Sequence, residues 1–328
     1  MSIETKVLGE LDGESFVSGE AISARLGITR SAIWKHIGAL RRQGFVIEAS
    51  PRRGYRLAAR PDKLLPALLQ PALKNSPICG PVIHFQKTGS TADEARLLVE
   101  AGAPEGTVVA AEAQTKGRGR MGRKWLTPAG TAIALSAILY PEISPTQAPL
   151  LSLAAALAVR EAVTGVVKIE TGAAAAIDLK WPNDIYLAGK KLGGVLVEMS
   201  AELDRIRWVI CSIGLNVNNS FAGAPLEREA TSLSAFWGRR FSRLELAKAI
   251  LAELGRTYDR TRSGSGLAGI AREFEKHDLL QGQRVSVSAP EGVLAGTAAG
   301  IDSEGRLRLR LPGGKERAFF SGEVSVRR

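Results

Sequence analysis

The sequence predicts an α/β protein built from more than one domain. Its 328 residues exceed the usual length of a single compact domain, and its 45% hydrophobic and 23% charged residues are ordinary values for a folded protein. The pattern along the chain changes twice. Helical spacing and a hairpin come first, alternating strands and helices follow, and short strands with glycine turns come last. We therefore expect domains at residues 1–60, 80–278 and 279–328, joined by a linker at 61–79.

Two short amphipathic helices are predicted in the first 45 residues. The first follows Ser18 and ends at Gly27, because glycine readily adopts the left-handed conformation that ends a helix. The second is expected to be capped by Ser31 and to end at Gly44. The apolar residues that recur at helical spacing are Ala21, Ile22, Leu26, Ile33, Ile37 and Leu40.

The charge of this first domain indicates a nucleic-acid partner. Residues 1–24 contain one lysine and five acidic residues, whereas residues 25–60 contain nine basic residues and one acidic residue. A hairpin with two arginines in its turn is predicted at 45–57, which completes the pattern of a winged helix-turn-helix. A helical module used only for protein contacts, with solvated charges, is the alternative. The expected DNA-contacting residues are Arg30, Ser31, Trp34, Lys35, Arg52 and Arg53.

The rest of the chain predicts a larger α/β domain and a small β-rich one. Predicted strands at 82–85, 107–111, 131–140 and 207–213 alternate with predicted helices at 91–101, 150–164 and 244–258. Short strands at 285–287, 294–298, 307–311 and 318–320 predict a small β-barrel. The linker contains prolines and leucines and is expected to include a short helix.

Several classes of protein are excluded by composition. Cys79 and Cys211 match neither a disulfide framework nor a metal-ligand spacing, and the three histidines are scattered, so we expect no dedicated metal site. Acidic residues occupy the region where a signal peptide is apolar. The longest apolar run, 148–159, is shorter than the roughly 20 residues of a membrane helix. The sequence therefore predicts a cytoplasmic protein with no membrane partner.

The segment from Gln114 to Trp125 carries the densest chemical signal, with five cationic residues, three glycines and no acid. Its glycines fit the spacing of a dinucleotide-binding motif, but that motif requires a helix to follow, and a proline and a β-rich run follow here. A Walker motif is excluded because no lysine and hydroxyl pair follows the last glycine. We interpret the segment as a flexible loop that surrounds a phosphate or acyl phosphate. Trp125 is either a stacking surface for adenine or a core residue.

A second signal is Lys180-Trp-Pro-Asn-Asp184, in which Lys180 ends a predicted strand between two apolar neighbours. This setting favours an ammonium that is partly withdrawn from water and neutralises phosphate charge, against the alternative of an ordinary surface lysine. Downstream, Gly193 and Gly194 lie in a β-rich run and indicate close approach of a ligand or of a packed neighbour.

A third signal is the pair Asn216 and Asn218, which are two residues apart on a predicted interior strand and therefore face the same side. Buried amides need hydrogen-bond partners. The edge of an adenine is one candidate partner, and the backbone of a turn is the other.

Four motifs in this order resemble the biotin-protein ligase family. They are Gly117-Arg-Gly-Arg-Met-Gly-Arg-Lys-Trp125, Lys180-Trp-Pro-Asn-Asp184, Gly214-Leu-Asn-Val-Asn218 and Thr231-Ser-Leu233. The predicted winged helix makes the chain similar to the bifunctional members, the biotin operon repressors, over essentially its whole length. The resemblance implies a central domain related to class II aminoacyl-tRNA synthetases and a C-terminal SH3-like β-barrel.

The resemblance also implies a reaction in two steps. Biotin and ATP, which brings Mg²⁺ with it, give biotinyl-5′-AMP and pyrophosphate. The biotinyl group then passes to a lysine of a biotin carboxyl carrier protein, such as that of acetyl-CoA carboxylase. Operator DNA and a second copy of the chain, in a homodimer, are the other implied partners.

Site residues follow from the resemblance by motif position. The implied biotin-binding residues are Ser90, Thr91, Gln114, Gly117, Arg118, Arg120, Lys180, Gly193 and Gly194. The implied ATP-binding residues are Trp125, Lys180, Asn183 and Asn216. Lys180, Arg118 and Arg120 are implied to be catalytic: the arginines close over the biotin carboxylate and the phosphate, and Lys180 stabilises charge as that carboxylate attacks the α-phosphate.

The chain departs from the family pattern at two places. Ala92 replaces an asparagine after Ser90-Thr91, and residues 168–176 resemble an insertion before the Lys180 motif. Two other functions remain open at this stage. One is a regulator that senses biotin or its adenylate without transferring biotin, which retention of Lys180 disfavours. The other is a lipoate-type ligase of the same broader fold.

Overall fold

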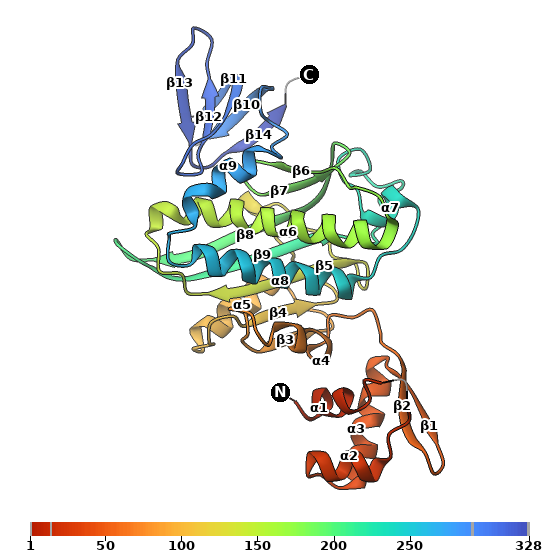
Figure 1. Ribbon diagram of the computed structural model, residues 1–328. Helices are drawn as coiled ribbons and strands as arrows, with labels where there is room; N and C mark the ends of the chain where they lie inside the picture. The colour runs from red at the N-terminus through yellow and green to blue at the C-terminus, as the bar shows by residue number, and fades with distance from the viewer. Residues whose placement is uncertain (1, 14, 290–291, 327–328) are drawn as a thin grey trace.

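The computed structural model describes residues 2–13, 15–289 and 292–326. Figure 1 shows three successive units, with the N-terminal helices and hairpin at one end, a sheet with long helices in the middle, and a small β-sheet at the other end. Residues 1 and 328, the outer bounds of the predicted domains, lie outside the described residues.

The N-terminal unit contains three helices and a hairpin. The helices are α1 (Ile3–Glu10), α2 (Gly19–Leu26) and α3 (Arg30–Gln43), and the antiparallel hairpin is β1 (Val46–Ser50) with β2 (Gly54–Ala59). The predicted bounds of α2 are confirmed, because the Ser18 side chain accepts the N–H of Ala21 and Gly27 ends the helix at a φ of +66°. Helix α1 was not predicted. It packs against α3, and the two helices share the buried core of this unit.

The prediction that Ser31 caps α3 is wrong. The helix begins two residues earlier than the prediction assumed, and Thr29 is its N-cap, with its hydroxyl accepting the N–H of Ala32 at 3.2 Å. Ser31 lies in the first turn of α3, and its hydroxyl is 3.0 Å from that of Thr29. Threonine and serine are both favourable N-cap residues, so the local sequence alone does not show whether Thr29 or Ser31 caps the helix.

The central unit is a seven-stranded sheet with the order β3-β4-β5-β9-β8-β7-β6 (Figure 1). Only β3 and β4 are parallel to each other, and the other neighbours are antiparallel. The strands are β3 (Val82–Phe85), β4 (Val108–Ala111), β5 (Ala132–Leu139), β6 (Ile177–Lys180), β7 (Asp184–Leu187), β8 (Lys190–Ala201) and β9 (Ile206–Asn216). Helix α5 (Thr91–Glu100) connects β3 to β4.

The two faces of this sheet are covered differently. Ile138 and Ile210 pack with Ala95 of α5 on one face. Their chain neighbours Leu139 and Cys211 point the other way and meet α6 (Ala148–Thr171) and α8 (Arg243–Thr261), because successive side chains of a strand alternate between faces. On this first face, helix α5 contacts β4, β5 and β9.

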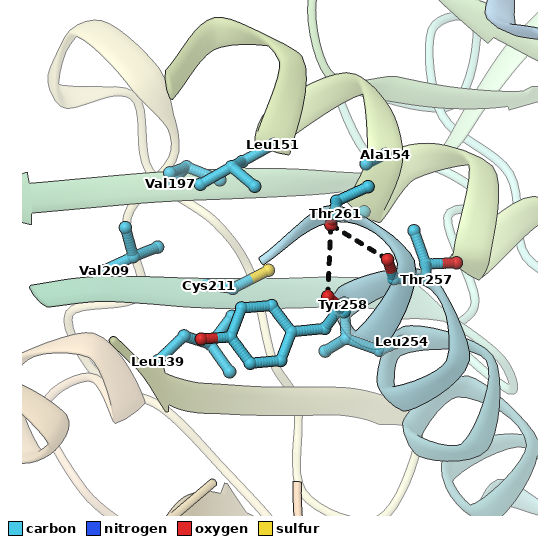
Figure 2. A pocket seen from close by; sticks show the side chains of 11 residues that line it. Leu139, Leu151, Ala154, Val197, Val209, Cys211, Leu254, Thr257, Tyr258 and Thr261 are labelled. Atoms are coloured by element: carbon cyan, nitrogen blue, oxygen red, sulfur yellow. Dashed lines mark hydrogen bonds between the residues drawn. The ribbon is translucent and has the colours of Figure 1, made fainter. Parts of the chain in front are cut away.

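A small apolar cavity lies on the α6 and α8 face. Figure 2 shows Leu139, Val209 and Cys211 of the sheet facing Leu151 of α6 and Tyr258 of α8. Its volume is about 20 Å³, enough for about one water molecule and far too small for biotin or ATP. Burial raises the pKa of the Cys211 thiol to about 12, so this cysteine is a neutral core residue.

Helix α6 is longer than predicted. It continues to Thr171, and Gly172 ends it at a φ of +71°, so the first four residues of the possible insertion at 168–176 extend the helix. The stretch 145–171 is long and apolar enough to cross a membrane by length and composition, and 67% of its most apolar window is buried. That burial is against the sheet and α8, as in the core helix of a globular domain.

The predicted linker is packed rather than exposed. It contains α4 (Pro66–Leu69) and the 3₁₀ turn η1 (Gln70–Leu73), so the prediction of a short helix is confirmed. Leu64, Leu69 and Leu73 are fully buried and belong to the main core. The central unit contains two further short helices, α7 (Leu233–Trp237) and α9 (Ile270–Glu275), of which only α7 was not predicted.

The C-terminal unit is a five-stranded antiparallel sheet with the order β13-β12-β11-β10-β14. Its strands are β10 (Arg284–Ala289), β11 (Gly292–Ile301), β12 (Leu307–Arg310), β13 (Glu316–Phe319) and β14 (Glu323–Val326), of which β14 was not predicted. The β-rich character is confirmed. Within residues 284–289 and 292–326, β13 and β14 are edge strands that do not pair with each other, so closure into an SH3-like barrel is not confirmed.

Candidate functional site

A row of cross-strand partners brings the separate motifs together. Lys180 pairs with Asp184, Asp184 with Gly194, and Gly194 with Gly214. Gly214 in turn pairs with Ala134 on β5. Residues from five strands and three motifs therefore lie on one line across the sheet, which sequence spacing alone does not reveal.

The floor beside this row is made of small side chains. On β9, Ser212, Gly214 and Asn216 alternate with the buried residues that face α6 and α8, so they lie on the α5 side. Their partners on β5 are Ser136, Ala134 and Ala132. Because small side chains on two adjacent strands let a flat group approach the sheet closely, we call this strip of residues the trough.

One end of the trough is a closed hydrogen-bond network around Gln114. Its Oε1 accepts the backbone N–H of Thr91 at 2.8 Å and the Thr91 hydroxyl at 3.2 Å, and its Nε2 donates to Thr127 at 2.9 Å. The Ser136 hydroxyl bonds Thr91 and Ser212, each at 2.8 Å. The predicted biotin residues Thr91 and Gln114 are thus held rigidly together.

Ser90 lies beside this network as the N-cap of α5. Its hydroxyl accepts the N–H of Ala92 at 3.3 Å, and its side chain is almost fully buried. Ala92, the departure from the family pattern, is also buried in the first turn of α5. Its methyl group offers no hydrogen bond to a ligand, so polar contacts at this end must come from Ser90, Thr91 and their neighbours.

The glycine-arginine segment is a compact hairpin rather than an open loop. Trp125 donates its N–H to the carbonyl of Gly117 at 2.8 Å, and Gly119 donates to Arg123 at 2.7 Å. A tight turn at Arg120–Gly122 connects the two arms. A side chain at Gly117 would meet the Trp125 carbonyl at 2.4 Å, so this position requires glycine for close approach of the two arms.

Trp125 lies directly on the sheet. A Cβ atom at Gly214 would be 2.5 Å from the indole ring, so the ring packs flat against a strand that only glycine leaves bare. The indole Nε1 is buried, and within the described part of the chain it has no hydrogen-bond partner. Such a donor is costly unless a ligand or water pairs with it.

The arginines of the hairpin are held by carboxylates. Arg118 Nη2 is 2.6 Å from Asp93 Oδ1 of α5 and 3.6 Å from Glu198 Oε1 of β8. Arg123 forms an ion pair with Glu323 of β14. Burial lowers the pKa of the Arg120 guanidinium, an effect that the charge of Asp184 partly offsets. Arg118 on one arm of the hairpin and Arg120 in its turn are therefore each near an acid.

Lys180 is a half-buried cation at the end of β6, as predicted. Burial lowers the pKa of its ammonium, Asp184 raises it, and Lys191 lowers it further. Among the described residues no acceptor lies within hydrogen-bond distance of Lys180 Nζ, and its nearest ring is Tyr186, at 5.5 Å. An ammonium in this setting gains from a phosphate ligand.

Lys191 is a second lysine of the site, and sequence reasoning missed it. Its Nζ is 2.6 Å from Asp184 Oδ1 and 5.9 Å from the centre of the Trp125 ring. The available signal was its place two residues before the Gly193-Gly194 pair. Asp184, Ser136 and Ser212 were also missed. The alternation of small or polar residues with large ones in β5 and β9 was the signal for the two serines.

The asparagines differ in their roles. Asn183 is buried and its amide donates to the carbonyl of Val195, so it shapes the turn after Lys180. Asn218 exchanges two hydrogen bonds with the backbone of Phe241, at 2.9 and 3.0 Å, so the backbone alternative holds for Asn218. Asn216 is only 4% exposed, and no side-chain hydrogen bond of Asn216 occurs within the described residues. Of the predicted asparagines, Asn216 is thus the one whose side-chain amide has no hydrogen-bond partner among the described residues.

The elements that carry the predicted DNA-contacting residues, α3 and the β1–β2 hairpin, lie in the N-terminal unit, away from the central sheet (Figure 1). Arg30, Ser31, Trp34 and Lys35 share the exposed side of α3, and Trp34 is 67% exposed. Arg52 lies at the tip of the hairpin with a φ of +72°. Arg53 instead stacks on Phe16, with its guanidinium 4.3 Å from the ring centre.

Sequence comparisons match all three units to known families. The Biotin/lipoate A/B protein ligase family matches residues 82–218, an HTH domain matches 4–56, and the Biotin protein ligase C terminal domain matches 281–327.

Individual relatives and solved structures agree with these matches. The chain is 40% identical to the Bifunctional ligase/repressor BirA of Bacillus subtilis, over 96% of this chain and 95% of that protein. It is 30% identical to the protein of the same name from Escherichia coli, over 99% and 98%. A biotin protein ligase from Aquifex aeolicus in complex with biotin and ATP superposes with a TM-score of 0.62 at 30% identity, covering 75% of this chain and 98% of that one. The chain belongs to the biotin protein ligase family, in its bifunctional ligase and repressor form.

Proposed function

We propose that the protein activates biotin with ATP, transfers it to a carrier protein, and represses transcription in response to biotin. The observation that carries the enzymatic part is the arrangement around Asp184. Two lysines and Arg120 gather there beside the trough that Trp125 and Gly214 line. A concentration of fixed, partly buried cations suits a reaction that joins two anions, a carboxylate and a triphosphate.

We assign the Gln114 end of the trough to biotin. The hydrogen bonds among Thr91, Gln114 and Ser136 hold these side chains in place, so little reorganisation is needed when the ureido ring binds. Ser90 contributes to the same end, and Gly117 lets the hairpin approach it closely. Gly194, the partner of Gly214, keeps the adjacent strand bare on this side, whereas the implied biotin residue Gly193 pairs with the buried Leu215 and faces the other side of the sheet.

We assign the Gly214 end to the nucleotide. Trp125 would stack on adenine, and its unpaired Nε1 and the amide of Asn216 would supply polar contacts. Asn183 fixes the turn that carries Lys180 and so contributes indirectly. Mg²⁺ would arrive with ATP, where it offsets the charge of the phosphates.

In the chemical step, the biotin carboxylate attacks the α-phosphate of ATP and pyrophosphate leaves. Lys180 and Lys191 flank Asp184, and both lie where negative charge develops. Arg118 and Arg120 would close over the mixed anhydride. In doing so Arg118 would leave Asp93, Arg120 would leave Asp184, and both would interact with the negatively charged groups of the ligand. The lysine amine of the carrier then attacks the biotinyl carbonyl, and AMP leaves.

The N-terminal unit, residues 1–60, would bind operator DNA through α3 and the β1–β2 hairpin. Tight binding by such modules normally requires a dimer, and the sequence contains no coiled coil that would provide one. We propose that the central unit, 80–278, dimerises when the hairpin orders around the adenylate. The adenylate is then the corepressor, and biotin with ATP raises dimer fraction and operator affinity together.

The carrier would be the biotin carboxyl carrier protein of acetyl-CoA carboxylase or a similar enzyme. The segment 279–328 would adopt an SH3-like barrel, with 61–79 as the connecting segment. A reducing cytoplasm suits the free thiols of Cys79 and Cys211.

The test is a transfer assay with two acids. The protein is incubated with MgATP, a carrier domain and either labelled biotin or labelled lipoate. We expect pyrophosphate release and carrier labelling in the reaction with biotin, and neither in the reaction with lipoate. Labelling by lipoate would assign the chain to the lipoate-type ligases, and operator binding without any labelling would make it a sensor that has lost transfer.

A further inference from the structure

A buried charged cluster joins the candidate site to the segment that leads to the helix-turn-helix. Arg243, the first residue of α8, and Glu112, which follows β4, are each 2% exposed, and Arg243 Nη2 is 2.8 Å from Glu112 Oε2. Burial alone would raise the pKa of Glu112. Bonds from His84 and from the N–H of Leu64, together with the charge of Arg243, lower it to about 2. Glu112 is therefore ionised throughout the physiological range, although its carboxylate is withdrawn from water.

The cluster holds the residues that follow the N-terminal unit. Arg243 donates to the carbonyl of Asp62 and places its Nε 3.6 Å from Asp62 Oδ2. Glu112 Oε1 accepts the N–H of Leu64 at 2.8 Å. Asp62 Oδ1 also accepts the N–H of Leu244 at 2.8 Å, in the first turn of α8. We call Asp62, Leu64, Glu112 and Arg243 the linker cluster.

The same segment also holds the C-terminal end of α3. Lys63, between Asp62 and Leu64, donates from Nζ to the carbonyl of Gln43 at 2.9 Å, and Gln43 is the last residue of α3. Pro61 lies against Gly44, the C-cap of α3. The orientation of α3 is thus tied to a segment of only a few residues, which the linker cluster fixes to the central unit.

On the other side, the linker cluster reaches both ends of the trough. Glu112 is two residues before Gln114, and its carbonyl accepts the N–H of Gly130 at 3.3 Å. Arg243 Nη1 donates to the carbonyl of Ala132 at 3.3 Å, and Ala132 is the cross-strand partner of Asn216. Direct bonds therefore connect these strand ends to Asp62 and Leu64.

We propose that Glu112 and Arg243 are positioning residues that couple occupancy of the trough to the orientation of α3. The inference rests on the proposed ligase and repressor function and adds the route by which the two are joined. Coupling between two sites is a free energy that acts equally in both directions. Weakening the route therefore lowers the effect of ligand on DNA binding without requiring any loss of either activity alone.

The test substitutes Asp62, which belongs to the linker cluster but touches no candidate ligand residue and is partly exposed, so that Asp62→Ala is expected to fold. The matched control is Asp12→Ala. Asp12 pairs with Arg60 within the N-terminal unit and has no contact with the central unit among the described residues. The quantity measured is the ratio of operator affinity with biotin and MgATP to that without them, at fixed salt.

We expect Asp62→Ala to lower this ratio at least fivefold while pyrophosphate release stays within twofold of the unsubstituted protein, and Asp12→Ala to change neither. Lys63→Ala is expected to lower the ratio as well, since it removes the bond to Gln43. An unchanged ratio in both Asp62→Ala and Lys63→Ala overturns the inference. A ratio of one in the unsubstituted protein overturns the proposed repressor function instead, and with it the coupling.

Discussion

The protein contains two groups of basic residues, and they are prepared for different kinds of phosphate. Arg30, Lys35 and Arg52 of the N-terminal unit are exposed, and none of them forms an ion pair with another described residue. In the central unit, Arg118 and Lys191 are each within 2.6 Å of a carboxylate. Basic side chains that bind DNA must extend into solvent to contact phosphates, and their binding is favoured by counterion release. Basic side chains that assist a reaction must instead be held in a fixed position in a site from which water is partly excluded.

The difference teaches that residue type alone does not separate the two functions. Both groups contain arginine and lysine at similar density in the sequence. The two groups differ in their surroundings. The central unit partly buries its group of basic residues and pairs it with carboxylates, whereas Arg30, Lys35 and Arg52 on the surface of the N-terminal unit are exposed and form no ion pair with another described residue. Each of the following predictions removes one group and asks whether the other function survives.

The largest effect should follow from deleting residues 1–60. We expect complete loss of binding to DNA from the chain's own promoter region, because every exposed cation of α3 and of the hairpin is removed. Much of the ligase activity should remain, since no residue of the trough is lost. A DNA shift assay and carrier labelling measure the two outcomes. Residual operator binding by the truncated protein would place the DNA surface elsewhere, and no operator binding by the full chain would mean a ligase with a vestigial winged helix.

The next largest effect concerns the two lysines beside Asp184. Lys180→Ala should slow adenylate formation by about 100-fold or more, the size expected for loss of one preorganised charge-stabilising group, while biotin affinity falls much less. Lys191→Ala should have an effect of comparable size because its ammonium lies at the Trp125 ring. Pyrophosphate release at fixed saturating substrates measures both, with Lys190→Ala as the control because its Nζ bonds the Glu227 carbonyl outside the trough. Near-normal release in one lysine variant would exclude that lysine from the chemical step.

The hairpin arginines should control retention of the intermediate more than its formation. Arg118→Gly or Arg120→Gly should release biotinyl-adenylate, so that biotin appears on lysines of unrelated proteins as well as on the carrier. Mass spectrometry of a mixture of carrier and a bystander protein measures this leakage. Arg123→Gly is the comparison, since its partner Glu323 lies on the C-terminal sheet. Full activity with label confined to the carrier would show that the hairpin is not a lid.

The smallest effect is expected from a single exposed cation. Lys35→Ala should weaken DNA binding and reduce the dependence of affinity on salt by about one counterion, while dimerisation stays unchanged. Sedimentation and a DNA shift assay over a salt series separate the two. Arg25→Ala, which removes an exposed cation already paired with Glu10, should change neither. A change in dimer fraction with Lys35→Ala would contradict the separation of the two surfaces.

The parts of the fold set by local sequence were predicted well. Ser18 and Gly27 delimit α2 because capping is decided by neighbouring residues. Lys180 ends a strand as expected, since a proline and a turn follow it. The errors arise where two local solutions are equally good, as for Ser31 and Thr29.

Features that depend on residues far apart in sequence were not predicted. Lys191 lies beside Trp125 only because β8 and β9 pair as neighbours, and the bond between Glu112 and Arg243 joins residues separated by most of the central unit. The edge strand β14 likewise depends on pairing with β10 rather than on its own composition. Spacing within a motif is visible in a sequence, but the register between distant strands is set by packing.

The most direct measurement of the central claim is transfer of biotin to a carrier domain by the unsubstituted protein. The protein, biotin, MgATP and the carrier are combined, and the intact mass of the carrier is followed beside a carrier whose acceptor lysine is replaced by arginine. The account predicts one biotinyl group on the lysine-containing carrier, dependent on ATP and accompanied by pyrophosphate, and none on the arginine form. An unmodified carrier with no pyrophosphate released would contradict it.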